Sequence, residues 1–540
     1  MVAVASQIDS SSEQFAANRA SMMTFVERLR ALETRAQKAS SKRQATFEKR
    51  GQLIPSDRLN RLLDPGMPFL RLHTLANFGV DNPDQETSIP GASVLVGIGF
   101  VGGARCMIWV DDSGISAGAM TGKTGEVALS LQTICKRQKL PLIHLVESAG
   151  ANLLQYQTEL WSTFGAIFRN LAQMSAMGLP TLVVLHGGST AGGAYMPGMS
   201  DYVIGVKENG MAALGGAALV RAATGEIAND RDLGGTEMHA SVTGVVEYLV
   251  EDDAHGLLKA REVFDRLDWN RRAVPVPRRS YRAPLYDVEE LAGAVPTDPK
   301  VPYDCREVLA RVVDGSDIEE FKPRYGASTL CAYTSITGIA CAVIGNNGPI
   351  DPNGATKAAQ FIQLCDQADL PIIFLQNTTG YMVGTEYEQA GMIKHGSKMI
   401  QAVSTTRVPK ISLYIGASFG AGNYGMCGWA YEPDFLFAWP SARTGVMAGQ
   451  SAATTMSEVA KAGAARKGIE IPAETLAEQE AVIRAHFDAQ EDAYSSSGRV
   501  LDHGVIDPRD TRKVLAFCLE TILEGRQRVL TPNSFAVARM

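Results

Sequence analysis

Two patterns of hydrophobic residues occur along this chain, and they predict different secondary-structure elements. In residues 13–50, apolar side chains such as Met22, Phe25 and Leu29 recur at three- and four-residue steps among charged ones, as in an amphipathic helix. From about residue 93 onward, short continuous apolar runs dominate, beginning with Val94–Val101, and such runs are typical of buried strands. Two helix-then-strand pairs follow, over residues 124–138 with 141–146 and 163–177 with 180–185. This alternation with short connections predicts an α/β fold.

The first half of the chain ends near Arg271, where the composition changes. Residues 276–300 are rich in proline and arginine, which predicts a stiff basic linker, although the arginines are also candidate phosphate contacts. A helical segment at 305–313 and apolar runs at 330–335 and 338–344 then repeat the order of the first half. A chain of 540 residues exceeds one ordinary core. We therefore predict two domains joined by a linker: residues 1–275, 276–300 and 301–540.

The stretch Leu185–Tyr195 is rich in glycine and alanine and directly follows the apolar run at 180–185. We expect the strand to end near residue 185 and the glycine-rich stretch to form a turn. Glycine has no Cβ, so no side chain blocks the approach of a ligand to the backbone N–H groups of such a turn. A turn of this kind can hold a negatively charged oxygen without a charged side chain.

This stretch has a copy in the second half of the chain. The run Pro409–Ile415 is followed by Gly416–Tyr424, and laying Gly192 on Ala421 also places Gly193 on Gly422, Tyr195 on Tyr424 and Pro180 on Pro409. Upstream, Cys135–Leu145 resembles Cys365–Leu375 at nearly the same offset. One glycine-rich turn is common, but two matched strand-and-turn units in the same order predict two copies of one domain.

Charge and cysteine usage narrow the class of protein. A formal net charge of −7 argues against nucleic acid as the main partner. The chain has no run of about 18 apolar residues, so we expect no membrane span. Its cysteines lie in apolar runs without a Cys-x-x-Cys pair, which favours reduced buried thiols over a metal site. We expect a cytoplasmic protein, or one of the mitochondrial matrix if the source is eukaryotic.

Few side chains suggest acid–base or nucleophilic chemistry. Glu147, at the end of a predicted strand, is a candidate general acid or base, or else a capping or positioning residue, and its counterpart in the second copy is Asn377. His186 opens the glycine-rich stretch and is a candidate substrate contact, whereas His144 is expected in the core. Each glycine turn alone also fits close backbone packing. Their duplication favours two oxyanion holes, in which paired N–H groups stabilise an enolate oxygen by several kcal/mol.

The chain resembles the carboxyltransferase (β) subunits of biotin-dependent acyl-CoA carboxylases, most closely the 3-methylcrotonyl-CoA and geranyl-CoA branch, which Asn423 and Tyr424 indicate. The similarity runs from Arg50–Arg58 to Gly504–Asp510. The motifs that carry it stand in the family's order: Ser189–Tyr195, Gly198–Asp201, Ala222–Glu226, Asp232–Gly235 with Met238 and His239, and Gly420–Gly428.

This resemblance implies a fold and a site. The fold would be two tandem crotonase-like (ClpP/crotonase superfamily) domains of ββα repeats in a hexameric β6 core, with the active site between the N-domain of one subunit and the C-domain of its neighbour. The amides of Gly192 and Gly193 would hold the acyl-CoA enolate oxygen, and those of Ala421 and Gly422 the biotin ureido oxygen. The implied substrate-binding residues are Glu147, Ala191, Ala194, Tyr195, Ala213, Gly215, Gly216, Asn423 and Tyr424.

The resemblance also implies the cofactor and the partner. Biotin would be carried by a separate α subunit with biotin carboxylase and biotin carrier domains, since this sequence contains neither a Met-Lys-Met biotinylation motif nor an ATP-grasp domain. That partner would use ATP and bicarbonate, and the substrate here would be a coenzyme A thioester. The enzyme would be a ligase that forms a carbon–carbon bond, with no metal and no protein base.

One departure from the family leaves the acyl group open. Methylcrotonyl enzymes usually carry a segment with Phe and Pro where this chain has Met211–Leu219, and the smaller residues remove volume near the implied acyl pocket. Ala149 and Trp429 also differ from the commonest residues. A geranyl, propionyl, acetyl or longer acyl chain therefore stays open. The residues are also compatible with a decarboxylase subunit, a crotonase-type hydratase or isomerase, and a non-catalytic scaffold.

Overall fold

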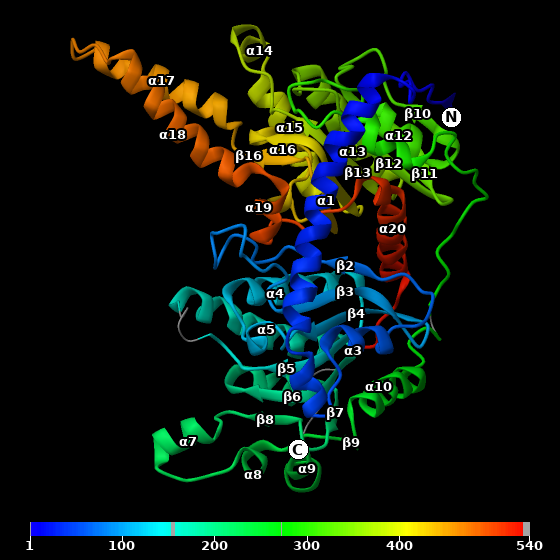
Figure 1. The fold of residues 1–540 in the computed structure, drawn as a ribbon. Helices are drawn as coiled ribbons and strands as arrows, with labels where there is room; N and C mark the ends of the chain where they lie inside the picture. The colour runs from blue at the N-terminus through cyan, green and yellow to red at the C-terminus, as the bar shows by residue number, and fades with distance from the viewer. Residues whose placement is uncertain (1, 153–156, 272, 533–540) are drawn as a thin grey trace. The chain divides into compact units, whose positions relative to one another are not determined.

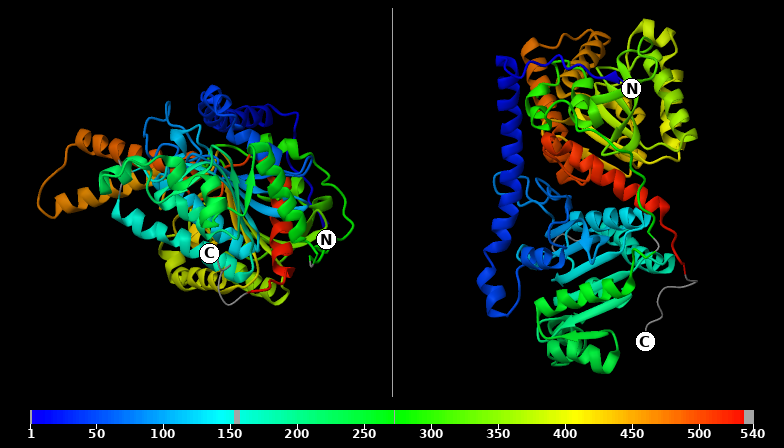
Figure 2. Two further views of the ribbon diagram at one scale, coloured as in Figure 1. Left: turned by 90° about the horizontal axis from the view of Figure 1, so that it is seen from below. Right: turned by 90° about the vertical axis from the view of Figure 1, so that its right-hand side faces the viewer.

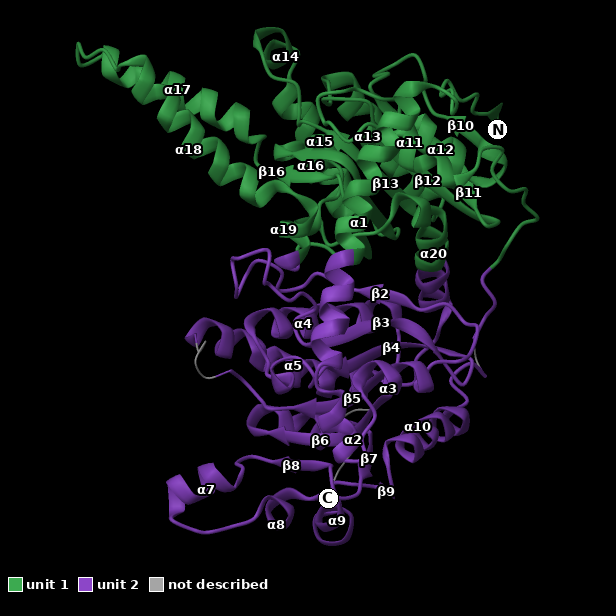
Figure 3. Cartoon of the chain, in the orientation of Figure 1, with its two compact units in different colours: residues 1–30, 277–497, 501–519 green, residues 31–276, 498–500, 520–540 purple. Residues whose placement is uncertain are grey.

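The structure, a computed structural model, describes residues 2–152, 157–271 and 273–532 (Figure 1). Its internal contacts divide the chain into two compact units, each discontinuous in sequence (Figure 3). Unit 1 comprises residues 1–30, 277–497 and 501–519, and unit 2 comprises residues 31–276, 498–500 and 520–540. The change from unit 2 to unit 1 after Val276 coincides with the start of the Pro- and Arg-rich segment, whose later residues 291, 292, 294 and 295 are buried.

Unit 2 is built on one sheet with the order β2-β3-β4-β5-β6-β7-β9, and β8 pairs with β6. The pairs β2–β3 and β3–β4 are antiparallel, and the remaining pairs are parallel. The strands are β2 (Leu70–Leu72), β3 (Val94–Val101), β4 (Ala104–Asp111), β5 (Leu142–Ser148), β6 (Thr181–Thr190), β7 (Tyr202–Val206), β8 (Met211–Ala213) and β9 (Tyr248–Val250).

The helices of unit 2 connect these strands, and α1 (Glu13–Ser41) contributes its later residues to this unit. The predicted helix over 13–50 is interrupted, because α1 ends at Ser41 and a second helix begins at Gln44. The others are α2 (Gln44–Lys49), α3 (Pro55–Leu62), α4 (Gly122–Gln138), α5 (Thr158–Met177), α6 (Tyr195–Met199), α7 (Ala217–Thr224), α8 (Asp230–Gly234), α9 (Thr236–Met238) and α10 (Asp253–Leu267).

Unit 1 repeats the order of strands β2 to β8, and its sheet differs at the edges, where its described strands include β1 and no counterpart of β9. Its sheet has the order β1-β10-β11-β12-β13-β14-β15, with β16 beside β14, as β8 lies beside β6. Strand β12 pairs with β13, and β13 with β14, in parallel, as do their counterparts in unit 2. The strands are β1 (Val2–Ala3), β10 (Asp317–Glu320), β11 (Thr329–Ile336), β12 (Ile339–Asn346), β13 (Ile372–Thr378), β14 (Lys410–Phe419), β15 (Phe435–Ala438) and β16 (Arg443–Gly445).

The helices of unit 1 include a long antiparallel pair, α17 and α18, that lies side by side in all views (Figures 1 and 2). The helices are α11 (Leu291–Ala294), α12 (Arg306–Val312), α13 (Pro352–Gln367), α14 (Thr385–Gln389), α15 (Met392–Thr405), α16 (Gly420–Gly425), α17 (Gly449–Ala465), α18 (Ala473–Glu491), α19 (Ala493–Gly498) and α20 (Thr511–Gln527). The last residues of α19 and α20 belong to unit 2. Within residues 2–152, 157–271 and 273–532, none of the helices has the length and apolarity to cross a bilayer.

The central strands explain the apolar runs of the sequence. Every residue of β4 and of β5 is buried, because helices or loops cover both faces of the parallel part of the sheet. Helix α4 begins where Thr121 accepts a hydrogen bond from the Thr124 amide, and α13 begins where Asp351 accepts one from the Gly354 amide. The mixed α/β fold class is therefore as predicted, with one sheet in each unit.

Candidate active site: two glycine turns

The first turn begins later than the sequence predicts. Strand β6 does not end near residue 185 but continues through the glycines to Thr190, because β8 pairs with Gly188, Ser189 and Thr190. Ala191 then has a left-handed φ of 54° and opens a short helix, Ala191–Ala194. Gly192 and Gly193 lie in the first turn of that helix, where amides lack intrahelical partners. Neither amide is used by the backbone hydrogen bonds that the described residues make outside their helices and strands.

The second turn follows the same backbone path. Phe419 ends β14 with φ −115° and ψ 153°, and Thr190 ends β6 with φ −115° and ψ 161°. Gly420 then has φ 56°, matching Ala191. The turn residues that follow also match in burial, since Gly192 and Ala421 are exposed whereas Gly193 and Gly422 are buried. The duplication seen in the sequence is therefore a duplication of conformation.

The two turns differ in the space available to a side chain. A Cβ on Gly422 would lie 2.8 Å from the Gly380 Cα and 3.2 Å from the Thr378 Cγ2. A Cβ on Gly193 would lie 2.9 Å from the Ser189 Oγ, and one on Gly192 would meet only the Phe168 ring, at 3.6 Å. The second turn therefore requires glycine at 422 because backbone packs directly against it.

Strand β8 brings a distant segment to the first turn. Its last residue, Ala213, pairs with Thr190, so the small residues that follow the strand begin beside the turn. Among them, Gly216 precedes α7, and Leu214 and Leu219 expose 62% and 57% of their surface. The segment that follows β8 therefore carries exposed apolar side chains.

A buried charge cluster lies where β6 leads into the first turn. The Arg58 guanidinium donates to Glu147 Oε2 at 2.6 Å and to Asp253 Oδ2 at 2.8 Å, and Asp253 Oδ1 lies 2.8 Å from His186 Nδ1. Burial works against the Asp253 carboxylate, but His186 and Arg58 outweigh it and lower its pKa to about 2. Burial, with Arg58 nearby, lowers the pKa of His186, so the ring is neutral near pH 7.

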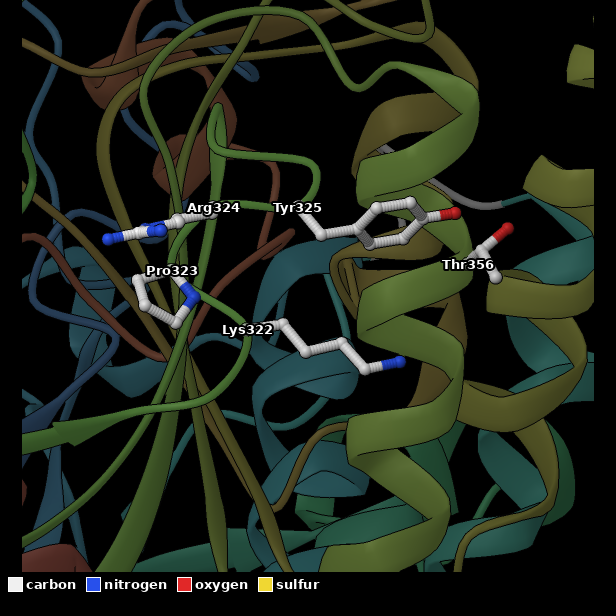
Figure 4. A pocket seen from close by; sticks show the side chains of 5 residues that line it. All are labelled: Lys322, Pro323, Arg324, Tyr325 and Thr356. Carbon is white, nitrogen blue, oxygen red and sulfur yellow. The ribbon is translucent and has the colours of Figure 1, made fainter.

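The described surface has hollows in both units. One of about 190 Å³ in unit 2 is lined by residues at the carboxyl ends of β4, β5 and β6 and by α2: Arg43, Thr46, Phe47, Arg50, Ser113, Ala117, Glu147, Ser148, Ala149 and Gly188. Another, of about 500 Å³ in unit 1, is open and is lined by Lys322, Pro323, Arg324, Tyr325 and Thr356. In Figure 4, Lys322 and Tyr325 extend toward Thr356 on α13.

Comparisons with known proteins show the family to which this chain belongs. The carboxyl transferase domain family matches residues 47–535. The chain belongs to that family. It is 45% identical to a probable biotin-dependent acyl-coenzyme A carboxylase beta2 subunit of Mycobacterium tuberculosis, over 91% of each chain. It is 40% identical to the mitochondrial methylcrotonoyl-CoA carboxylase beta chain of Arabidopsis thaliana, over 99% of this chain and 91% of the relative.

A solved structure extends the match to the fold. The beta subunit of P. aeruginosa geranyl-CoA carboxylase superposes on this carboxyltransferase with a TM-score of 0.93 and 45% identity, covering 100% of both chains. The predicted crotonase-like fold and the predicted family, the carboxyltransferase subunits of biotin-dependent acyl-CoA carboxylases, are thereby confirmed. The turn residues and the domain boundaries stay predictions.

The predicted side chains of the carboxyltransferase fall into two groups. Tyr195 and Tyr424 expose 45% and 47% of their surface at the two turns. Glu147 and His186, by contrast, are 6% and 0% exposed and bonded within the charge cluster. The proposed substrate contact of His186 stays a prediction, and the structure shows this ring buried against Asp253. His144 is buried as predicted, stacked on Trp109 at 4.0 Å between ring centroids.

Sequence reasoning missed the partners of Glu147 and His186 in this carboxyltransferase. Arg58 and Asp253 are 195 residues apart, and no local pattern joins them. The sequence did single out Arg58, because it ends the Arg50–Arg58 motif. That motif does not indicate which side chains Arg58 contacts. All the cysteines are buried, as predicted. Within the part of the chain that the structure describes, no cluster of His, Cys, Asp and Glu has the arrangement of a metal site.

Proposed function

We propose that this carboxyltransferase moves a carboxyl group from biotin, carried by a partner subunit, to the coenzyme A thioester of a branched, unsaturated acid of the 3-methylcrotonyl or geranyl type. One observation carries the proposal: a turn with a left-handed residue at the same position and with the same burial pattern follows the corresponding strand in both units. A reaction in which two different oxygens each accumulate negative charge needs two such turns. The relatives named for methylcrotonoyl-CoA and geranyl-CoA support the acyl class.

The backbone amides have separate roles in this proposal. The Gly192 and Gly193 amides hold the thioester oxygen as the acyl group becomes an enolate, and the Ala421 and Gly422 amides hold the ureido oxygen of biotin. Biotin, when bound, supplies the carboxyl group and the base that removes the substrate proton. Loss of a single well-placed oxyanion donor costs about 10²–10³ in kcat in other enzymes, so a pair of donors is sufficient without a charged residue.

The residues around the turns fit these two groups. On the acyl side we assign Ala191, Ala194, Tyr195, Ala213, Gly215, Gly216 and Glu147, the last acting through its ion pair. On the biotin side we assign Asn423 and Tyr424. The Asn423 amide nitrogen donates to Ser418 Oγ at 2.8 Å and to Tyr414 Oη at 3.1 Å, which fixes the helix that follows the turn. The exposed Tyr424 ring then provides an apolar wall for a neutral ring system.

The ion pair of Glu147 argues against a crotonase-type hydratase or isomerase. Such an enzyme needs a carboxylate that exchanges protons with the substrate. Glu147 lies in β5, the strand that pairs with β6, and accepts a 2.6 Å hydrogen bond from the buried Arg58. A guanidinium at that distance fixes the orientation of the carboxylate, as a positioning group requires.

The proposal includes an assembly. The partner is an α subunit that carries biotin carboxylase and biotin carrier domains and uses ATP and bicarbonate to load biotin. The β subunits form a β6 core in which an active site uses the first turn of one subunit and the second turn of its neighbour. The expected location is the cytoplasm, or the mitochondrial matrix of a eukaryote. The family membership and the names of the relatives support the biotin-dependent partner.

Carboxyl transfer run in reverse tests this function. The purified protein is offered free biotin with 3-methylglutaconyl-CoA, carboxygeranoyl-CoA or methylmalonyl-CoA, and loss of the carboxyl group is followed. We expect turnover of one of the first two. Preference for methylmalonyl-CoA would replace the proposed acyl class. No turnover of any of the three, even with a biotinylated α subunit present, would contradict the proposed function.

A further inference from the structure

Each turn is preceded by the same irregularity in the sheet. In unit 2, β5 and β6 pair Val146 with Leu185 and Ser148 with Ser189, so that Glu147 faces the three residues His186–Gly188. In unit 1, the register of β13 and β14 shifts at the equivalent place. Extra residues in one strand bend it and redirect the residues that follow. The shape of each bulge therefore sets the direction in which its turn presents amides.

The first bulge is held by polar and charged side chains. Gln52 Nε2 donates to the His186 carbonyl at 2.8 Å. The His186 ring is held by Asp253, and since a carboxylate only accepts, Nδ1 carries the hydrogen. Arg58, which is 0% exposed, joins Asp253 to Glu147. The bulge is thus bonded at its backbone and at the side chains on either side of it.

The second bulge is held by a single neutral side chain at the corresponding atom. Ile415 occupies the place of His186, and its carbonyl accepts a hydrogen bond from the Tyr303 hydroxyl at 3.0 Å. Asn377 packs over Gly416, where an added Cβ would collide with its amide oxygen. Glu147 covers Gly187 of the first bulge in the same manner. The two bulges have the same backbone shape, but different side chains hold them. We call these side chains the clamps: Gln52, Arg58 and Asp253 form the first clamp, and Tyr303 forms the second.

This contrast separates what the fold needs from what each site needs. Among the hydrogen bonds of the described residues, none joins a charged side chain to Asn377 or to residues 415–417, so the backbone conformation of the bulge does not require an ion pair. Burying a guanidinium and two carboxylates carries a desolvation cost that an ion pair does not reliably offset. A charged clamp at the first bulge therefore indicates that the first turn has a different function from the second.

We propose that Gln52 and Arg58 are positioning residues that aim the first turn at the acyl-CoA, and that Tyr303 is the separate positioning residue that aims the second turn at biotin. The inference rests on the proposed function, because it assigns one clamp to each of its two substrates. In this assignment Gln52 and Tyr303 act through the bulge carbonyls, Arg58 acts through Glu147 and Asp253, and the role of all three is to position the turns. Weakening one clamp misdirects one turn only.

A matched pair of substitutions tests this assignment. Gln52→Met and Tyr303→Phe each remove the donor to one bulge carbonyl and preserve side-chain size. In the reverse reaction, we expect Gln52→Met to raise the KM for the carboxylated acyl-CoA at least 5-fold and leave the KM for free biotin within 2-fold. Tyr303→Phe should give the opposite pattern. Thermal melting and the oligomeric state by light scattering are measured on the same samples.

The outcomes distinguish a failure of this inference from a failure of the proposed function. A merely structural role would lower the melting temperature and leave both KM values unchanged, and that result overturns the inference, as does a pattern in which both KM values move together. If Gln52→Met does not assemble, Arg58→Lys gives the same test, because it retains the charge and weakens the link between Glu147 and Asp253. Wild-type protein without turnover would overturn the proposed function and this inference with it.

Discussion

Replacing Gly422 by alanine should damage the second turn through a steric conflict that the structure defines. The new Cβ would lie 2.8 Å from the Cα and 3.1 Å from the carbonyl carbon of Gly380 and 3.2 Å from the Thr378 Cγ2. Two of these atoms belong to backbone, and Gly380 has a φ of 125° that restricts its adjustment. Overpacking of this kind costs about 1–3 kcal/mol of folding free energy.

The effect on catalysis should exceed the effect on stability. To relieve the contact, the turn must move away from Gly380, and this movement redirects the Ala421 and Gly422 amides. Oxyanion donors act only when they lie within hydrogen-bond distance of the developing charge, and loss of one costs about 2.7–4 kcal/mol of transition-state stabilisation. We therefore expect kcat for reverse carboxyl transfer to fall about 10²–10³-fold.

The first turn provides a matched control for stability. At Gly192, the position equivalent to Ala421, an added Cβ meets only the Phe168 ring at an ordinary 3.6 Å. Gly192→Ala should therefore change the free energy of unfolding by less than about 0.5 kcal/mol. Urea unfolding and the reverse assay are run on both variants. Gly422→Ala with wild-type stability and turnover within about threefold of wild type would refute the steric reasoning.

Single residues carry three further predictions. Ala213→Phe should fill the space beside Thr190 and lower kcat/KM for carboxygeranoyl-CoA about 10–100-fold relative to 3-methylglutaconyl-CoA; an unchanged ratio would show that Ala213 does not line the acyl site. Burial raises the pKa of Asp502 to about 7, so the carboxyl of the folded protein keeps its proton up to about that pH. Because the unfolded carboxyl loses its proton near pH 3.8, the contribution of this group to the free energy of unfolding falls as the pH rises from about 3.8 to 7. Asp502→Asn should then raise the free energy of unfolding at pH 8 by up to about 4 kcal/mol, with the gain shrinking toward pH 4; equal stability of the two proteins at pH 8 would contradict this. Ala191→Gly should cost no stability in urea unfolding, because Ala191 already has a left-handed φ of 54°, whereas Ala477→Gly on the exposed face of α18 should cost about 1 kcal/mol.

The local pattern of apolar and glycine residues was sufficient to predict the main strands and the duplicated turn. The apolar run Val94–Val101 became a strand with the predicted bounds, because a strand buried on both faces must be apolar along its whole length. The alignment of Gly192 with Ala421 held at the level of backbone angles, since Ala191 and Gly420 share a left-handed φ. Periodicity and glycine placement are properties of neighbouring residues, so the sequence alone determined them.

Only the tertiary structure decided what surrounds the turns. Strand β6 extends to Thr190 because β8, from a later part of the chain, supplies its hydrogen-bonding partner. His186 and Glu147 are bonded within a buried charge cluster because Arg58 and Asp253 reach them from helices distant in sequence. Burial and charge pairing are set by contacts between residues far apart along the chain, and no local pattern specifies which of them meet.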